Sequence, residues 1–373
     1  MGQTAGLSSN IFTDRALIQF EGAGAASAVV GKKIMITGAG GSVGSALARE
    51  ILSFEPSSLL LLEHSENNLF QIEKALFENP AGSRVVSFLG DVNDELLLDE
   101  IFERHGPQLV FHAAAFKHVP LLENHPLSAI QNNVVGTHSL AKKSVQHHAL
   151  RVVMLSTDKA VNPSSIMGAS KRIAELILRA MSTPETTMLS VRFGNVIGSR
   201  GSVFPLFAEQ IKLRRPLTVT HPEATRYFLN LSEAVNLVLQ AVWLGSGGDI
   251  LVPELGRPVK ILHVAEQLIH QSGLLPDVDL PIVFTGLRPG EKMHEELISD
   301  NEVAGQTEIK GIRKIAQPAV SLIEVERWLT GLQESLKRRN VSALVEEVCR
   351  IVPEYRPSPA VLESGRAKKL ERQ

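Results

Sequence analysis

Short apolar segments alternate with amphipathic segments from residue 32 onward, and this alternation constrains the fold more than any other feature of the sequence. The short segments are almost continuously apolar, which is typical of strands buried on both faces of a sheet. We expect strands at 33–37, 58–62, 84–89, 109–112, 151–155 and 188–191. The amphipathic segments between them predict helices on both faces of a parallel sheet. The sequence therefore predicts an α/β fold with a doubly wound, Rossmann-type parallel sheet.

The pattern loosens after about residue 195 and indicates a second, smaller lobe. Helical segments there are mixed with short strand-like segments at 217–219, 249–252 and 281–284, and a helical end follows. Small residues dominate the start of the chain, whereas prolines and basic residues dominate its end. We therefore expect four parts, namely a flexible arm (1–30), a nucleotide-binding domain (31–195), an interleaved substrate-binding lobe (196–355) and a solvated tail (356–373).

Composition excludes several classes of function. The 38 lysine and arginine residues nearly balance the 40 aspartate and glutamate residues, so no global positive field exists to collect nucleic acid. The single cysteine, Cys349, excludes an intramolecular disulfide and an all-cysteine metal cluster, and the histidines lack metal-ligand spacing, so we expect no metal. No segment approaches the roughly 18 apolar residues of a membrane span. We expect a cytoplasmic protein without a membrane span.

A glycine-rich turn follows the first expected strand and opens the first expected helix. Gly38, Gly41 and Gly44 let backbone N–H groups approach a pyrophosphate at the N-terminus of that helix. Glu63 ends the second strand, where a carboxylate can accept both ribose hydroxyls and repel a 2′-phosphate, which favours NAD over NADP. The alternative is a structural turn beside a surface carboxylate. Other expected cofactor contacts are Ser42, Val43, Asp91, Val92, Ala113, Ala114 and Ala115.

Among these positions, Asp91 has an equally good alternative role as a helix cap.

The residues best suited to chemistry follow the fifth expected strand. Thr157, Asp158 and Lys159 lie at its carboxyl end, which is where doubly wound folds bind their ligands. Lys171 lies on the helix that follows. We expect the three strand-end residues to face a nicotinamide ring, with a plain ion pair between Asp158 and Lys159 as the alternative.

This arrangement resembles the extended short-chain dehydrogenase/reductases. That superfamily has a similar glycine turn, a Ser or Thr at the end of the fifth strand and Tyr-x-x-x-Lys on the next helix. The sequence matches at Thr157 and Lys171, but Met167 occupies the tyrosine position. A thioether cannot exchange a proton near neutrality. Because neither Tyr227 nor Tyr355 precedes a lysine by four residues, we expect the charged residues to carry the proton chemistry.

Within that superfamily, Ser-Thr-Asp-Lys-Ala-Val at 156–161 together with Met-x-x-x-Lys resembles the nucleotide-sugar 4,6-dehydratases of bacterial polysaccharide synthesis. Those enzymes act mainly on UDP-N-acetylglucosamine. Further similar segments lie in register at 116–120, 132–137, 192–196, 201–203, 225–228 and 286–292. One departure is His294, where tyrosine is commoner. Larger members carry a membrane portion and a second nucleotide-fold domain, and we expect this chain to be a stand-alone catalytic unit.

The resemblance implies a closed redox cycle in which the sugar is oxidised at C4, loses water across C5 and C6, and regains hydride at C6. The implied catalytic positions are Thr157 at the 4-oxygen, Asp158 as the acid at O6, Lys159 as the base at C5, Lys171 on the nicotinamide ribose, and Met167. The division between acid and base requires a lowered lysine pKa and a raised aspartate pKa. The group that takes the 4-hydroxyl proton stays open.

The resemblance also implies contacts with a UDP-sugar. Lys117 and Asn133 would line the sugar end, with a surface charge and a packing amide as the respective alternatives. The nucleotide-diphosphate contacts would be Arg192, Asn195, Ser202, Val203, Arg226, Arg288 and Glu291. Arginine's planar fork suits diphosphate oxygens, although each arginine has a structural ion pair as its alternative.

Two other functions stay open at this point. An NAD-dependent UDP-sugar 4-epimerase would share the cofactor site but normally needs the missing tyrosine. A non-catalytic NAD-binding sensor or scaffold would have no reason to retain Asp158, Lys159 and Lys171 together. Family members often pair through helices corresponding to 119–145 and 164–182, so we expect a homo-oligomer. For the reaction at C5 we expect retention of configuration.

Overall fold

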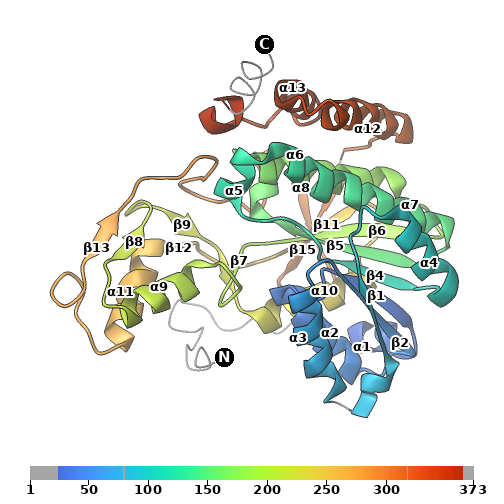
Figure 1. Cartoon of the computed structure of the whole chain (residues 1–373), viewed down its shortest axis with the longest axis horizontal. Helices are drawn as coiled ribbons and strands as arrows, with labels where there is room; N and C mark the ends of the chain where they lie inside the picture. Colours follow the sequence, from blue (N-terminus) through green and yellow to red (C-terminus); the bar gives the residue numbers. More distant parts are fainter. Residues whose placement is uncertain (1–23, 79, 317, 364–373) are drawn as a thin grey trace.

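The computed structural model describes residues 24–78, 80–316 and 318–363, and its centre is a nine-stranded sheet (Figure 1). The strand order is β14–β15–β11–β6–β5–β4–β1–β2–β3. The bounds are β1 (Lys33–Thr37), β2 (Ser58–Glu63), β3 (Val85–Leu89), β4 (Leu109–His112), β5 (Arg151–Thr157), β6 (Thr187–Phe193), β11 (Asp249–Pro253), β14 (Ala304–Gln306) and β15 (Ile312–Ala316). The strands from β3 across to β11 pair in parallel, whereas β15 and β14 pair antiparallel. The predicted doubly wound sheet is confirmed.

Helices cover both faces of this sheet, as the alternation predicts (Figure 1). One face carries α1 (Gly24–Val29), α2 (Ser42–Ser53), α3 (Glu66–Phe77) and α10 (Leu231–Leu244). The other carries α4 (Glu95–His105), α7 (Gly136–Gln146) and α8 (Ile166–Met181). Continuous apolar strands form here because each face of the sheet meets its own layer of helices.

Helix α8 carries both Met167 and Lys171. Ser165 caps its N-terminus by accepting a hydrogen bond from the backbone N–H of Gly168. Every residue from Ile166 to Leu178 is buried, since the sheet lies on one side and further helices lie on the other. A helix that is covered all round holds its side chains in fixed positions.

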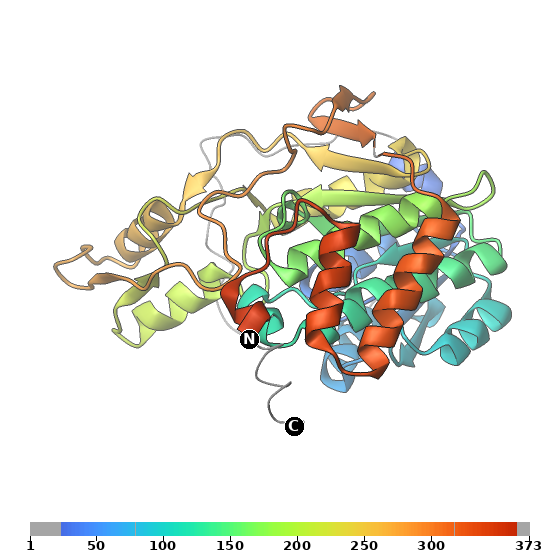
Figure 2. The same cartoon turned by 90° about the horizontal axis from the view of Figure 1, so that it is seen from above.

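The C-terminal helices α12 (Leu322–Lys337) and α13 (Val341–Ile351) form the hairpin that covers α8 from outside (Figure 2). They share an apolar cluster with α5 (Val119–Asn124) and α6 (Pro126–Ile130). A short π-helical segment, Gln131–Val135, joins α6 to α7. Part of the helical face through which we expected two copies to pair therefore lies beneath the chain's own hairpin.

The smaller lobe is less extensive than the predicted range 196–355. It contains α9 (Val203–Lys212), α11 (Ile261–Gln271), β8 (Leu217–Val219) paired with β13 (Ile282–Phe284), and β9 (Thr225–Arg226) paired with β12 (Val259–Lys260). The short strands β7 (Asn195–Val196) and β10 (Phe228–Leu229) pair where the lobe meets the sheet. The predicted strand 249–252 instead joins the central sheet as β11 (Asp249–Pro253), in which all five residues are buried.

The predicted loose ends are also wrong in part. Residues 24–29 of the expected arm form α1, in which Val29 is fully buried. In the expected tail, Ser358 and Val361 are buried, and the backbone N–H of Arg356 donates to the Pro163 carbonyl. Residues 1–23 and 364–373 lie outside the described residues. Among the described helices, none combines the length and apolar composition that crossing a bilayer requires.

Candidate active site

The residues expected to carry the chemistry lie where β5 ends, near the middle of the sheet (Figure 1). Thr157 is the last residue of β5, and Asp158–Ala160 form a single 3₁₀ turn after it. The Thr157 hydroxyl donates to Asp158 Oδ1 at 2.9 Å and accepts from the Lys159 backbone N–H at 3.4 Å. The strand end therefore fixes the orientation of both charged side chains.

Asp158 and Lys159 form an ion pair with an unused acceptor. Lys159 Nζ lies 2.9 Å from Asp158 Oδ1 and 3.2 Å from Asn195 Oδ1. Asp158 is fully buried, and within the described residues its Oδ2 has no hydrogen-bond partner. The Lys159 side chain is 21% exposed. One oxygen of the aspartate thus holds the lysine and the other is free for a ligand.

A second carboxylate, Glu295, completes this cluster, and no sequence motif pointed to it. Its Oε1 lies 3.5 Å from Lys159 Nζ and 3.7 Å from Arg226 Nε. Glu295 is 4% exposed, and its Oε2 has no partner among the residues that the structure describes. We call Asp158, Lys159, Arg226 and Glu295 the Lys159 cluster. No spacing in the sequence relates Glu295 to β5, because only the return of the chain from the lobe brings them together.

The electrostatics of Lys159 differ from the expectation. Burial disfavours its charged ammonium, but the carboxylates of Asp158 and Glu295 outweigh that penalty and raise its pKa above the usual lysine value. The lowered pKa that we expected is wrong for the protein alone, and Glu295 is part of the reason. Burial raises the pKa of the Glu295 carboxyl, and the positive charges of Lys159 and Arg226 only partly offset that effect.

Helix α8 brings Lys171 to the same region. A Cβ added to Gly168 would clash with the carbonyl group of Lys159, so the start of α8 packs directly on the turn after β5. Lys171 is 4% exposed, and burial lowers its pKa to about 8, although Glu175 opposes this shift. Met167 lies in the apolar cluster beneath the C-terminal hairpin and is 2% exposed. Its thioether faces that core, which corrects its inclusion among the catalytic positions.

The glycine turn has the form that a dinucleotide requires. Gly38 has a φ of 66°, and a Cβ added there would lie 2.6 Å from the backbone nitrogen of Ala114. Gly41 is the N-cap of α2 and provides no side-chain cap, so backbone N–H groups at the helix start stay available to an anion. These features fit a bound pyrophosphate. Ser42 and Val43 lie in the first turn of α2, and Gly44 packs against the Gly38 carbonyl.

Glu63 ends β2 as expected, but its carboxylate has different hydrogen-bond partners from those expected. Its Oε2 accepts from the Gly40 backbone N–H at 2.9 Å, and its Oε1 accepts from the Ser65 N–H at 3.0 Å. The residue is 3% exposed. Glu63 therefore fastens the glycine turn to β2, while its negative charge stays at the edge where an adenosine ribose would lie.

A small hollow beside the turn is lined by several of the expected cofactor residues. Its lining is Gly38, Leu62, His64, Gly90, Asp91, Val92, Ala114 and Asn132. Asp91 Oδ1 accepts from both nitrogens of Asn93, whereas Asp94 caps α4. The helix-cap alternative for Asp91 is therefore wrong. Ala113 and Ala115 lie in the same segment after β4.

Arg200 was also missed, although it reaches the glycine turn from the other lobe. Its backbone N–H donates to Ser42 Oγ at 3.0 Å, and its Nη1 donates to the Gly40 carbonyl at 3.3 Å and to Asn68 Oδ1 at 2.5 Å. Lys117 Nζ donates to the Arg200 carbonyl at 2.9 Å. The segment between β7 and α9 thus closes over the expected cofactor site, and no sequence motif links positions so far apart.

Two expected substrate contacts have structural roles instead. The Arg192 guanidinium is fully buried and bonds to Glu175 and Glu302, with four contacts of 2.8–2.9 Å. With Ser156, which donates to Glu175 at 2.6 Å, these residues form what we call the Arg192 cluster. Asn133 is fully buried, and its amide bonds to the Phe116 backbone and to Ser170. Both predictions are wrong, because a buried guanidinium or amide needs its partners within the protein.

Of the other expected substrate residues, two contact the Lys159 cluster. Burial lowers the pKa of the Lys117 amine, and the positive charge of Lys159 adds to this effect. Ser202 is the N-cap of α9, and its buried Oγ has no partner within the described ranges. Arg288 is 60% exposed and donates to Glu291 through Nε at 2.9 Å. Asn195 and Arg226 contact the cluster directly, and Val203 begins α9.

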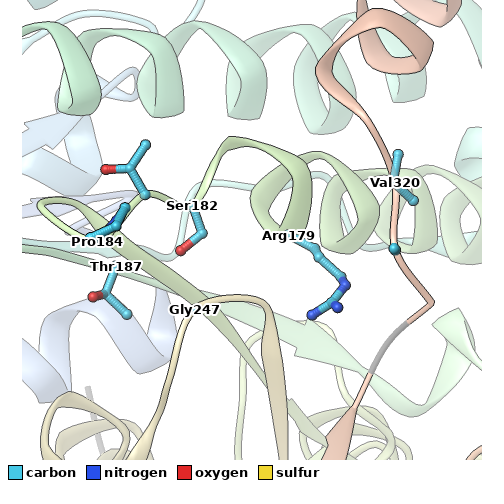
Figure 3. A pocket seen from close by; sticks show the side chains of 8 residues that line it. Arg179, Ser182, Pro184, Thr187, Gly247 and Val320 are labelled. Atoms are coloured by element: carbon cyan, nitrogen blue, oxygen red, sulfur yellow. The ribbon is translucent and has the colours of Figure 1, made fainter.

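A larger hollow of about 410 Å³ lies elsewhere, between the end of α8 and the start of β6 (Figure 3). Its lining includes Arg179, Ser182, Thr183, Gly247 and Val320. Arg179 Nε donates to the Pro318 carbonyl, while the hydroxyls of Ser182 and Thr183 accept backbone N–H groups of their own loop. Because its polar groups stabilise the loops around it, we assign no ligand to this hollow. In the part of the chain that the structure describes, no group of acidic, histidine or cysteine residues has metal-site geometry.

Comparison with known proteins supports the same assignment of fold. Residues 34–317 match the family described as polysaccharide biosynthesis protein. The capsular polysaccharide biosynthesis protein CapD of Staphylococcus aureus is 47% identical over 279 residues, which are 74% of this chain but 46% of CapD. The chain therefore spans about half the length of that relative.

Two further similar proteins cover more of their own length. The UDP-glucose 4-epimerase of Rickettsia rickettsii is 34% identical over 334 residues, covering 86% of this chain and 94% of the epimerase. The X-ray structure of Pen from Bacillus thuringiensis superposes with a TM-score of 0.72 at 29% identity, covering 79% of this chain and 92% of Pen.

Proposed function

The chain belongs to the polysaccharide biosynthesis protein family, and from that membership we propose that it is a nucleotide-sugar 4,6-dehydratase acting on UDP-N-acetylglucosamine with NAD. The product would be a UDP-4-keto-6-deoxy-N-acetylhexosamine for surface polysaccharide or glycan synthesis. The observation that carries this proposal is the Asp158–Lys159 pair at the end of β5, in which Asp158 Oδ2 is free. An elimination of water needs an acid at the leaving oxygen and a base at the neighbouring carbon.

The pair can supply both groups through a single internal proton transfer. Moving one proton from Lys159 Nζ to Asp158 Oδ1 across 2.9 Å creates a neutral amine and a protonated carboxyl. The amine removes the proton at C5, and the carboxyl donates its proton to O6 as water leaves. After elimination Lys159 is an ammonium and Asp158 a carboxylate. When hydride returns to C6, Lys159 gives a proton back to C5. A solvent proton, which balances the one released from the 4-hydroxyl during oxidation at C4, then restores the ion pair.

The remaining site residues would bind and orient NAD and the nucleotide sugar. NAD, when bound, supplies the hydride acceptor for C4 and the hydride donor for C6. The uncapped start of α2 would hold its pyrophosphate, and Lys171 would donate to the nicotinamide ribose. Thr157 would hydrogen-bond the 4-oxygen. The N-terminus of α9, with the unpartnered Ser202 Oγ, is the support for placing the sugar diphosphate there.

A UDP-sugar 4-epimerase is the second candidate, because the similar Rickettsia protein bears that name. Such an enzyme would need a proton-transfer group at the 4-oxygen in place of the missing phenol. Tyr355 does not supply one, because it is 2% exposed within the apolar cluster of the C-terminal hairpin. The Asp158–Lys159 pair, which an epimerase does not need, favours the dehydratase.

The test is to incubate the protein with UDP-N-acetylglucosamine and NAD in D2O and to analyse the product by mass spectrometry and NMR. A dehydratase gives a product that has lost one water, with deuterium at C5, and the configuration at C5 follows from the same spectrum. An epimer of unchanged composition would establish the second candidate instead. Repeating the incubation with UDP-glucose distinguishes the substrate.

A further inference from the structure

Glu295 lies against Lys159, and it belongs to no motif of the glycine turn or strand β5. Its Oε1 is 3.5 Å from Lys159 Nζ, and its Oε2 is buried without a partner in the described residues. We propose that Glu295 is a positioning residue that sets the proton occupancy of Lys159 and so controls when that amine can act as a base. This inference rests on the proposed function for its role in turnover.

The local fold holds the carboxylate in place from both sides. His294 forms a bridge with Thr225, whose hydroxyl lies 2.9 Å from His294 Nδ1. On the other side Leu297 is buried in the main core, and its carbonyl accepts from Arg192. Because the segment is fixed before and after Glu295, its carboxylate faces Lys159 in a defined geometry rather than as a mobile surface charge.

The charges around Glu295 explain what it would do. Three cations act on Glu295, namely Lys159 after β5, Arg226 in β9 and Lys292 in the same segment as Glu295. Asp158 is the nearby group of like charge. Lys292 is held by the carbonyl of Val161, and Arg226 by the carbonyls of Thr225 and Met293. These cations therefore cannot turn away when Lys159 changes its charge.

The proposed proton transfer leaves Glu295 as the counter-charge of Arg226. With Glu295 ionised, the four groups of the Lys159 cluster sum to zero whether the mobile proton is on Lys159 or on Asp158. Without that carboxylate, Asp158 alone would balance the two cations Lys159 and Arg226, so the cluster would carry one excess positive charge and the ammonium of Lys159 would lose its proton at lower pH.

The experiment measures the protonation of Lys159 directly. Each protein is labelled with acetic anhydride across a range of pH, and mass spectrometry follows acetylation of the peptide that contains Lys159. We expect Glu295→Gln to lower the midpoint of Lys159 labelling by about one pH unit, a tenfold rise in labelling at a fixed lower pH. Glu296→Gln is the matched control, because Glu296 is exposed and bonds to Asn162 instead. It should leave the midpoint unchanged.

A midpoint in Glu295→Gln that equals the wild-type value overturns the proposal. If that variant does not fold, Glu295→Asp replaces it, because shortening the side chain withdraws the charge and should shift the midpoint in the same direction by less. A labelling midpoint in Glu295→Asp that equals the wild-type value would also overturn the proposal. The labelling needs no substrate, so a shifted midpoint in a protein that makes no dehydrated sugar would refute the proposed function and leave the Glu295–Lys159 coupling intact. In an active protein, the basic limb of the pH profile of kcat/KM must move with the midpoint.

Discussion

The Arg192 cluster and the Lys159 cluster are both buried groups of charges at the carboxyl end of β5, yet they are built in opposite ways. Ser156 belongs to the first and is followed by Thr157, which holds Asp158 of the second. In the first, two carboxylates satisfy one guanidinium with short bonds. In the second, Asp158 Oδ2 and Glu295 Oε2 have no partner within the described ranges.

This difference separates a group that holds the fold from one that is prepared for chemistry. Leaving a buried polar atom unpaired costs roughly 1–3 kcal/mol, so a fold retains such atoms where a ligand satisfies them. The Arg192 cluster joins α8 to β5 and β6 and keeps Lys171 in place. In the function that we propose, the two unpartnered carboxylate oxygens of the Lys159 cluster serve substrate binding and proton exchange.

The largest expected effect is on turnover through the Lys159 cluster. Asp158→Asn and Lys159→Ala remove the acid and the base, and each should lower kcat by about 10³-fold, within the range for general acid–base groups. NAD affinity, measured by fluorescence titration, should stay within about twofold. Full turnover by both variants would show that this cluster is only an ion pair.

Substitutions in the Arg192 cluster should lower the free energy of unfolding rather than turnover. Arg192→Ala leaves the fully buried Glu175 and the partly buried Glu302 with Arg172 as their remaining cation, and it should cost about 3 kcal/mol of unfolding free energy. Urea denaturation followed by circular dichroism measures the loss. A variant that unfolds at the wild-type urea concentration but has lost diphosphate affinity would restore Arg192 as a substrate ligand.

Lys171 is a buried cation outside both clusters, and burial lowers the pKa of its amine from 10.5 to about 8. Because the unfolded chain binds this proton more tightly, the burial penalty is full below pH 8 and disappears as the pH rises from about 8 to 10.5. Lys171→Met should therefore be more stable than the wild type at pH 7, by an amount on the order of 3 kcal/mol, and equal near pH 10.5. A difference in unfolding free energy that does not change with pH would contradict this account.

The smallest expected effects come from one matched pair of substitutions. Glu302→Gln weakens one of the two carboxylate contacts of Arg192 and should cost about 1–2 kcal/mol of stability without moving the midpoint of Lys159 labelling. Glu295→Gln should do the reverse, with little loss of stability and a shifted midpoint. Thermal melts and the labelling experiment, run on both variants, compare the clusters directly. Equal behaviour of the two variants would remove the distinction between them.

Local patterns in the sequence predict the parts of this molecule that depend on neighbouring residues. Continuous apolar segments indicated the parallel strands, and the spacing of Gly38, Gly41 and Gly44 indicated a turn that the structure shows packed against Ala114. The segment at Thr157–Lys159 was placed at a strand end for the same reason. Each of these features is encoded within a short stretch of chain.

Contacts between distant segments could not be predicted in this way. Arg192 stands beside a motif residue, but its role is decided by Glu175 and Glu302, which come from other elements. Glu295 and Arg200 reach the site only after the smaller lobe folds back on the sheet. The C-terminal segment looked solvated from its prolines and charges, yet Val361 completes an apolar cluster.

The most direct test of the account follows the hydrogen at C4 of the sugar. UDP-N-acetylglucosamine deuterated at C4 is incubated with the protein and NAD, and NMR locates the deuterium in the product. The account predicts a 4-keto sugar lighter by one water that carries the deuterium at C6. Deuterium returned to C4 of an epimerised sugar that has kept its water would contradict the proposed function.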